Sequence, residues 1–88
     1  MATKIHISGL SIDTNEAQIR EAFTKYGSVN DIQIIEHKGQ NSSEEALVEM
    51  MDVQEAQKAI TQLHNHALNE RKVRVVQAPI GMKFVSLQ

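Results

Sequence analysis

The stretch from residue 44 to 50 places two carboxylates where they could meet a ligand. Glu45 and Glu49 fall on one side of a strict alternation, with Leu47 between them, and the other side carries Ala46, Val48 and Met50. An alternation of period two is typical of a β-strand with one buried face. We therefore expect a strand whose outward surface carries two carboxylates and one leucine, and carboxylates repel phosphate groups.

Basic side chains occupy outward positions in two other alternating stretches. Lys4 and His6 alternate with isoleucines near the N-terminus, and Lys72 and Arg74 alternate with valines near the C-terminus. Lysine and arginine are the side chains that bind phosphate groups. Two arrangements of these charges are open. In one, Glu45 and Glu49 pair across strands with Lys4, Lys72 or Arg74, and the surface neutralises itself. In the other, the three cations remain available to bind an anionic ligand.

Metal binding and catalysis have little support in the sequence. His64 and His66 stand two residues apart, whereas a metal-binding pair on a helix has a spacing of four. The chain contains no cysteine, no glycine loop for phosphates and no serine coupled by a motif to a base. Glu44 and Glu45 are adjacent, so in a strand they point to opposite faces. We expect no catalytic residue, no metal site and no cofactor, and therefore no enzyme.

Size and net charge limit the class of protein. The chain has 88 residues, enough for one small domain, and 9 basic against 11 acidic residues give it a net charge of −2. Strong, indiscriminate binding to nucleic acid is not expected, because such affinity comes from many phosphate contacts. No stretch approaches the roughly 18 apolar residues of a membrane span. We expect a soluble protein that binds no membrane and is cytoplasmic, or nuclear if its source is eukaryotic.

The residue patterns predict six elements in the order strand, helix, strand, strand, helix, strand. Strands are expected over about 4–10, 29–34, 44–50 and 72–77, and helices over about 16–26 and 53–63. Two pairs of residues have the spacing of a capping box at a helix start, Asn15 with Gln18 and Asp52 with Glu55. Gly27 is expected to end the first helix in a left-handed conformation.

This order of elements predicts the ferredoxin-like βαββαβ fold, an α+β architecture. Right-handed crossovers place both helices on one face of a four-stranded antiparallel sheet. The opposite face, called the open face below, is left for a ligand or a partner. The domain is expected to comprise residues 1–78.

An apolar tail follows the domain at residues 79–88. It contains five large apolar side chains, Ile80, Met82, Phe84, Val85 and Leu87. Apolar groups of this kind are normally covered. We expect the tail to form an extra strand or a flap over or beside the sheet, within one chain or between two, against Ile35, Leu47 and Val76.

Three groups of residues resemble the RNA recognition motif family over about residues 4–77. Its first-strand hexamer resembles Ile5-His6-Ile7-Ser8-Gly9-Leu10. Its first-helix and second-strand positions correspond to Ile19, Phe23, Tyr26-Gly27 and Val29. Its closing pattern corresponds to Leu63-His64-Asn65, Leu68, Arg71, Val73 and Val75. The resemblance implies the same βαββαβ fold and an RNA-binding function.

In that family, RNA is held largely by aromatic rings on the two central strands. The ring positions correspond to His6, Glu45 and Leu47, and only His6 has a planar ring. The loss of two stacking rings costs about 2–6 kcal/mol, so we expect weak, salt-sensitive binding of short single-stranded RNA. We expect His6 to stack on a base and Leu47 to give it apolar support. Phosphate or base contacts are expected from Lys4, Gln33, Lys72 and Arg74.

An alternative hypothesis predicts the same fold but a protein partner in place of RNA. The missing rings and the net negative charge also suit a protein-interaction module with little RNA binding. In that hypothesis a protein partner or a second copy of the chain binds through the sheet face or through the tail, residues 79–88.

Overall fold

The computed structural model describes residues 2–35 and 43–78, and it confirms the predicted fold class. Its elements are β1 (Thr3–Ser11), α1 (Glu16–Thr24), β2 (Val29–Ile35), β3 (Ser43–Met50), α2 (Val53–Leu63), β4 (Ala67–Leu68), β5 (Arg71–Lys72) and β6 (Arg74–Gln77). The predicted tail lies outside the described residues.

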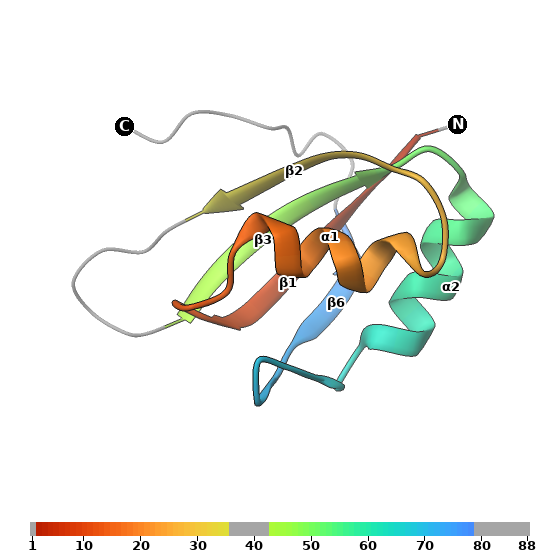
Figure 1. The fold of residues 1–88 in the computed structure, drawn as a ribbon. Helices are drawn as coiled ribbons and strands as arrows, with labels where there is room; N and C mark the ends of the chain where they lie inside the picture. Colours follow the sequence, from red (N-terminus) through yellow and green to blue (C-terminus); the bar gives the residue numbers. More distant parts are fainter. Residues whose placement is uncertain (1, 36–42, 79–88) are drawn as a thin grey trace.

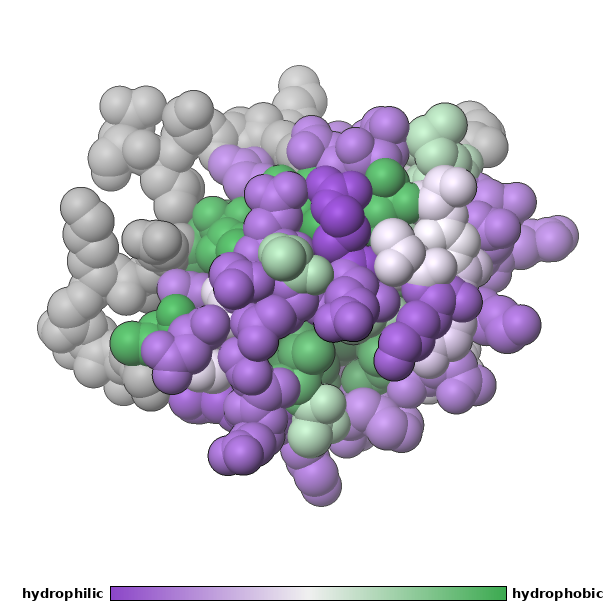
Figure 2. Space-filling model, in the orientation of Figure 1, coloured by the Kyte–Doolittle hydropathy of each residue, from purple (hydrophilic) through white to green (hydrophobic). Residues whose placement is uncertain are grey.

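Four strands form one antiparallel sheet in the order β2-β3-β1-β6. The two strands at the centre, β3 and β1, are therefore the third and the first along the chain. Both helices cover the same face of this sheet (Figure 1). That helical face is mostly hydrophilic at its surface, with small separate hydrophobic patches (Figure 2). The sheet is thus covered on one side and open on the other.

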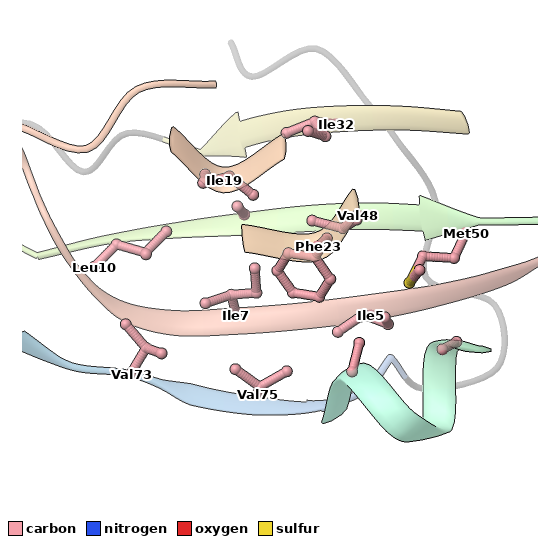
Figure 3. Packing of buried hydrophobic residues seen from close by; sticks show 13 residues of the cluster. Ile5, Ile7, Leu10, Ile19, Phe23, Ile32, Val48, Met50, Val73 and Val75 are labelled. Carbon is pink, nitrogen blue, oxygen red and sulfur yellow. The ribbon is translucent and has the colours of Figure 1, made fainter. Parts of the chain in front are cut away.

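The core lies between the sheet and the two helices. Ile5 and Ile7 of β1 and Val48 of β3 are fully buried and point toward the helices, where Phe23 of α1 packs at the centre (Figure 3). Strand β6 contributes Val75 to the same cluster. The predicted alternation is confirmed, because the inward residues of all four strands belong to this one core.

The predicted last strand is divided, which is a difference from the sequence interpretation. Strand β6 begins at Arg74, and Lys72 belongs to β5, which pairs with β4 in a separate two-stranded hairpin. The two residues of its turn, Asn69 and Glu70, have φ of 58° and 66°. Positive φ at both central residues is the requirement of a type I′ hairpin turn. The turn therefore reverses the chain before the sheet strand begins.

One of the two predicted capping boxes is confirmed. At the start of α1, Asn15 Oδ1 accepts from the Gln18 amide at 2.9 Å, and Gln18 Oε1 accepts from the Asn15 amide at 3.0 Å. At α2, Asp52 Oδ1 accepts a hydrogen bond from the Gln54 amide at 2.7 Å. The reciprocal bond of a capping box, from the Asp52 amide to the Glu55 side chain, is not formed. The Glu55 carboxylate instead accepts from the backbone amide of residue 28 at 3.4 Å, which links α2 to the loop after α1.

Gly27 has a role other than the predicted one, and Gly9 allows a bulge in β1. Helix α1 ends at Thr24, and Gly27 does not have a positive φ. A Cβ at Gly27 would overlap the Glu55 carboxylate, so close packing requires this glycine. Gly9 has φ of 81° inside β1, where the pairing with β3 shifts by one residue between Ile7 and Leu10. This shift is a β-bulge, which allows β1 to continue past the predicted end at residue 10.

Candidate nucleic-acid interface on the open face

Four side chains form one row across the open face, one from each strand of the sheet. His6 of β1 lies opposite Leu47 of β3 on one side and opposite Val76 of β6 on the other. Leu47 in turn lies opposite Gln33 of β2. The residues on both sides of His6, Leu47 and Gln33, and Val75 before Val76, pack in the core, so alternation directs this row to the open face. The sheet thus brings three predicted site residues together.

Two predicted cations lie on either side of this row. Lys4 precedes His6 by two residues on β1 and lies opposite Glu49 of β3. Arg74 of β6 lies opposite Ser8, two residues after His6, and is exposed. The side of the open face formed by β1 and β6 therefore carries Lys4, His6 and Arg74 on neighbouring positions.

Lys72 lies at the margin of this surface. It is exposed and belongs to β5, which is not a strand of the four-stranded sheet. The Lys72 carbonyl oxygen would lie 3.3 Å from a Cβ placed on Gly9, so β5 packs directly against β1 at the bulge. The prediction that Lys72 projects from the last strand of the sheet is wrong, because the hairpin turn removes it from that strand. It remains next to the open face.

The ring of His6 is held by a carboxylate from the neighbouring strand. His6 Nε2 lies 2.7 Å from Glu45 Oε1, and the side chains of the two residues are 20% and 35% exposed. A separation of 2.7 Å is typical of a charge-assisted hydrogen bond. The sequence interpretation paired Glu45 with a lysine or an arginine, and it missed this contact with His6. Alternation does put both residues on one face, but only the register of β1 against β3 makes them neighbours.

The other half of the open face, formed by β2 and β3, is acidic. Glu49 Oε1 accepts a hydrogen bond from Asn30 Nδ2 at 2.6 Å, and Asp31 of β2 lies opposite Glu49. With Glu45, this half carries three carboxylates. A phosphate would be attracted to the β1–β6 half and repelled by the β2–β3 half.

Leu47 is far less accessible than an outward strand residue is expected to be. It is 1% exposed, yet it is not a member of the core cluster on the helical side. His6 and Gln33 lie directly opposite it on the two neighbouring strands, and Glu45 and Glu49 lie two residues away on its own strand. Long side chains thus flank the leucine on four sides. Its use as a support for a base requires these neighbours to move.

Two other kinds of site lack support in the same part of the chain. Within residues 2–35 and 43–78, no three histidine, cysteine, aspartate or glutamate side chains are grouped as a metal ion would need. Neither of the two described helices has the length and apolar character that crossing a membrane requires. The candidate site is therefore the open face.

The residues that build this face match a known family. A family model for the RNA recognition motif matches residues 5–74. The chain belongs to the RNA recognition motif family. This match includes most of β1 and all of β3, and so His6, Glu45 and Leu47 lie within it. It confirms the resemblance seen in the sequence and supports RNA binding as the function of the domain.

Relatives and solved structures agree with this assignment. The chain is 39% identical over 75 residues to glycine-rich RNA-binding protein 5, mitochondrial, of Arabidopsis thaliana, an alignment that covers 84% of this chain and 26% of that protein. The chain spans between 24% and 52% of the length of the curated relatives that it matches.

Two solved structures have the same fold. The Pes4 RRM3 structure has a TM-score of 0.80 at 20% identity, covering 94% of this chain and 99% of that one, and at this identity it shows the fold alone. The C-terminal RRM domain of MEC-8, solved bound to AGCACA, has a TM-score of 0.74 at 25% identity, covering 94% of this chain and 98% of that one.

Proposed function

We propose that this domain binds short single-stranded RNA across the β1–β6 half of its open face. The observation that carries the proposal is the position of His6. Its imidazole is a planar ring on a central strand, and Lys4 and Arg74 lie two register positions away on either side. A ring between two cations is an arrangement that can stack on a base while its phosphates are neutralised.

Each predicted site residue has a role in this proposal. His6 stacks on a base, and Arg74 contacts a phosphate or stacks its guanidinium on a second base. Lys4 and Lys72 contact phosphates as point charges. Gln33 hydrogen-bonds a base edge, and Leu47 supports a base once the side chains around it have moved. The MEC-8 domain supports the size of the ligand, since it was solved with six nucleotides.

The proposed affinity is weak and depends on salt. A family member with three stacking rings gains about 1–3 kcal/mol from each, and this domain has one ring at those positions. Glu45 and Glu49 add repulsion on the same face. Because few phosphates are contacted, the dependence of affinity on salt is shallow compared with that of a strongly basic protein.

The experiment that tests the proposal compares two double variants of the chain. Replacing both His6 and Arg74 by alanine should weaken the binding of a pool of mixed-sequence single-stranded RNA octamers at least about thirtyfold, measured by fluorescence anisotropy. The control replaces Arg20 and His66 by alanine. Arg20 lies on α1, and His66 lines a hollow on the helical side together with Phe23. The control therefore removes one arginine and one histidine, as the test variant does, but at positions that are not on the open face. Equal affinities of the two variants would refute the proposal.

Three finer predictions belong with this proposal. The domain is a binding module and not an enzyme. A protein partner or a second copy binding through the sheet face or through residues 79–88 stays a prediction, which light scattering at several protein concentrations can test. A cytoplasmic location also stays a prediction, and three relatives carry the word mitochondrial or chloroplastic in their names.

A further inference from the structure

A hairpin with cationic side chains adjoins the open face at the bulge in β1. We propose that this hairpin, Ala67–Lys72, is a second RNA-binding element, in which Lys72 contacts a phosphate beyond the nucleotide that stacks on His6 and Asn69 positions the hairpin for that contact. This inference rests on the proposed function and deepens it, because it gives the RNA a direction on the same surface and adds a positioning residue.

The charge of this region is opposite to that of the whole chain. Residues 67–74 contain three basic residues, Arg71, Lys72 and Arg74, and one acidic residue, Glu70, whereas the chain has a net charge of −2. Lys72 and Arg74 are exposed, and among the described residues neither side chain is paired with a carboxylate. An anion is therefore attracted to the hairpin end of the open face.

The positions of the cations give the RNA a direction. Arg74 lies opposite Ser8, two residues from His6, and Lys72 precedes Arg74 by two residues. Two extended residues span about 7 Å, so Lys72 lies up to about 14 Å beyond the row that contains His6. At the other end of β1, Lys4 lies opposite a carboxylate, that of Glu49. The attractive path from His6 therefore leads past Arg74 to the hairpin.

The hairpin depends on contacts with the rest of the domain for a fixed position. Its ladder pairs two residues of each strand, and an isolated hairpin of this size is at best marginally stable in water. Leu68 packs against the core. The Lys72 carbonyl oxygen lies against the bulge of β1, 3.3 Å from a Cβ placed on Gly9. These two contacts hold the strands of the hairpin, and a third holds its turn.

Asn69 ties the turn of the hairpin to the start of α1. Its Nδ2 donates to Gln18 Oε1 at 3.2 Å, and its Oδ1 accepts from Gln18 Nε2 at 3.3 Å. The same Nδ2 donates to Thr14 Oγ1 at 3.4 Å, and Thr14 is 4% exposed. The turn itself requires only a residue that adopts positive φ, which glycine does readily. The amide pair with Gln18 is therefore a separate role of Asn69.

A fixed hairpin lowers the entropic cost of the contact between Lys72 and a phosphate. Lysine has a flexible stem, which loses freedom when the ammonium group binds. Because the backbone of Lys72 is already held against β1, only its side chain has to be ordered. A hairpin released from Gln18 would have to be ordered as well. The effect of Asn69 on RNA affinity should therefore pass through Lys72.

The first test removes the proposed phosphate contact. Lys72→Ala should weaken the binding of the pool of mixed-sequence RNA octamers about fivefold, measured by fluorescence anisotropy at low salt. The slope of log K against log salt should fall by about 0.7, the value for one phosphate contact on a single strand. Lys58→Ala is the matched control, because it removes an exposed lysine from α2, on the other face of the sheet. It should change neither quantity.

The second test separates positioning from a general effect on the fold. Asn69→Gly keeps a residue that adopts positive φ and removes the amide pair with Gln18, so affinity should fall about threefold. The same substitution made in the Lys72→Ala chain should change affinity less than about 1.5-fold, because the contact that it positions is already absent. An amide NMR spectrum unchanged at β1 and β3 confirms that the sheet is intact in each variant.

The inference is wrong if Lys72→Ala binds the octamers as tightly as the wild-type chain, or if Lys58→Ala loses as much affinity. Equal losses from Asn69→Gly with and without Lys72 would overturn the positioning role. All of these results leave RNA binding on the sheet intact, since the effect of His6 and Arg74 is measured separately. Absence of octamer binding by the wild-type chain would instead refute the proposed function.

Discussion

The two halves of the open face have the same backbone and opposite electrostatic character. On the β1–β6 side, the outward residues include Lys4, His6 and Arg74, whereas the β2–β3 side carries three carboxylates, Asp31, Glu45 and Glu49. Their inward residues do not differ in this way, because all four strands supply aliphatic side chains to one core. Packing therefore fixes one face of the sheet and leaves the other free to vary.

This difference underlies the proposal that RNA binds to one half of the open face and contacts few nucleotides there. In a family that stacks bases across two central strands, the acidic half would normally take part in binding. Here its carboxylates repel phosphates, so RNA is expected to follow β1 and β6 and to contact few nucleotides. Three variants test this difference between the two halves.

Restoring rings on the acidic half should have the largest effect. Replacing Glu45 and Leu47 together by phenylalanine adds two stacking platforms on β3 and removes one carboxylate. Each platform is worth about 1–3 kcal/mol, so affinity for the RNA pool should rise at least about thirtyfold in an anisotropy titration. Light scattering should confirm that the variant remains monodisperse. An unchanged affinity would mean that RNA does not lie over the central strands.

Reversing a charge on the basic half should have an intermediate effect. Arg74 is exposed and lies at an edge strand, so Arg74→Glu should not disturb the core. The substitution removes a phosphate contact and adds repulsion, and affinity should fall about tenfold with a shallower dependence on salt. Arg20→Glu on the helical face is the matched control and should change affinity less than about twofold. Equal losses in the two variants would indicate a general charge effect.

Neutralising one acid on the far half should have the smallest effect. Asp31 is exposed on β2, at the opposite edge of the sheet from β6. Asp31→Asn keeps the shape of the side chain and removes one repulsive charge, so RNA should bind about twofold more tightly at low salt. The gain should disappear at high salt, where exposed charges are screened. A loss of affinity would show that the carboxylate itself contacts a base.

The sequence predicted the fold because each element had a local signal. Alternation identified the strands, and Asn15 with Gln18 marked the start of α1 with the hydrogen bonds that the structure contains. The hairpin at β4 and β5 was missed because its turn is Asn69-Glu70, and a glutamate gives no sequence signal for the positive φ that it adopts. The same turn explains why Lys72 was assigned to the wrong strand.

The candidate site was predicted less completely than the fold. Alternation placed His6, Gln33, Leu47 and Arg74 on one face, and the structure agrees. The contact between His6 and Glu45 depends on which residues of β1 and β3 lie side by side, and no short-range pattern encodes that register. The burial of Leu47 is likewise a property of the folded chain, which the alternation of one strand does not encode.

The RNA-binding surface can be mapped directly by titrating the ¹⁵N-labelled chain with RNA octamers and following the backbone amide shifts by NMR. If RNA binds the β1–β6 half, the largest shifts fall at His6 and Ser8 of β1 and at Arg74 and Val76 of β6. The amide of Asp31 on β2 should move little. Shifts concentrated on β2, or on the helices, would contradict the assignment.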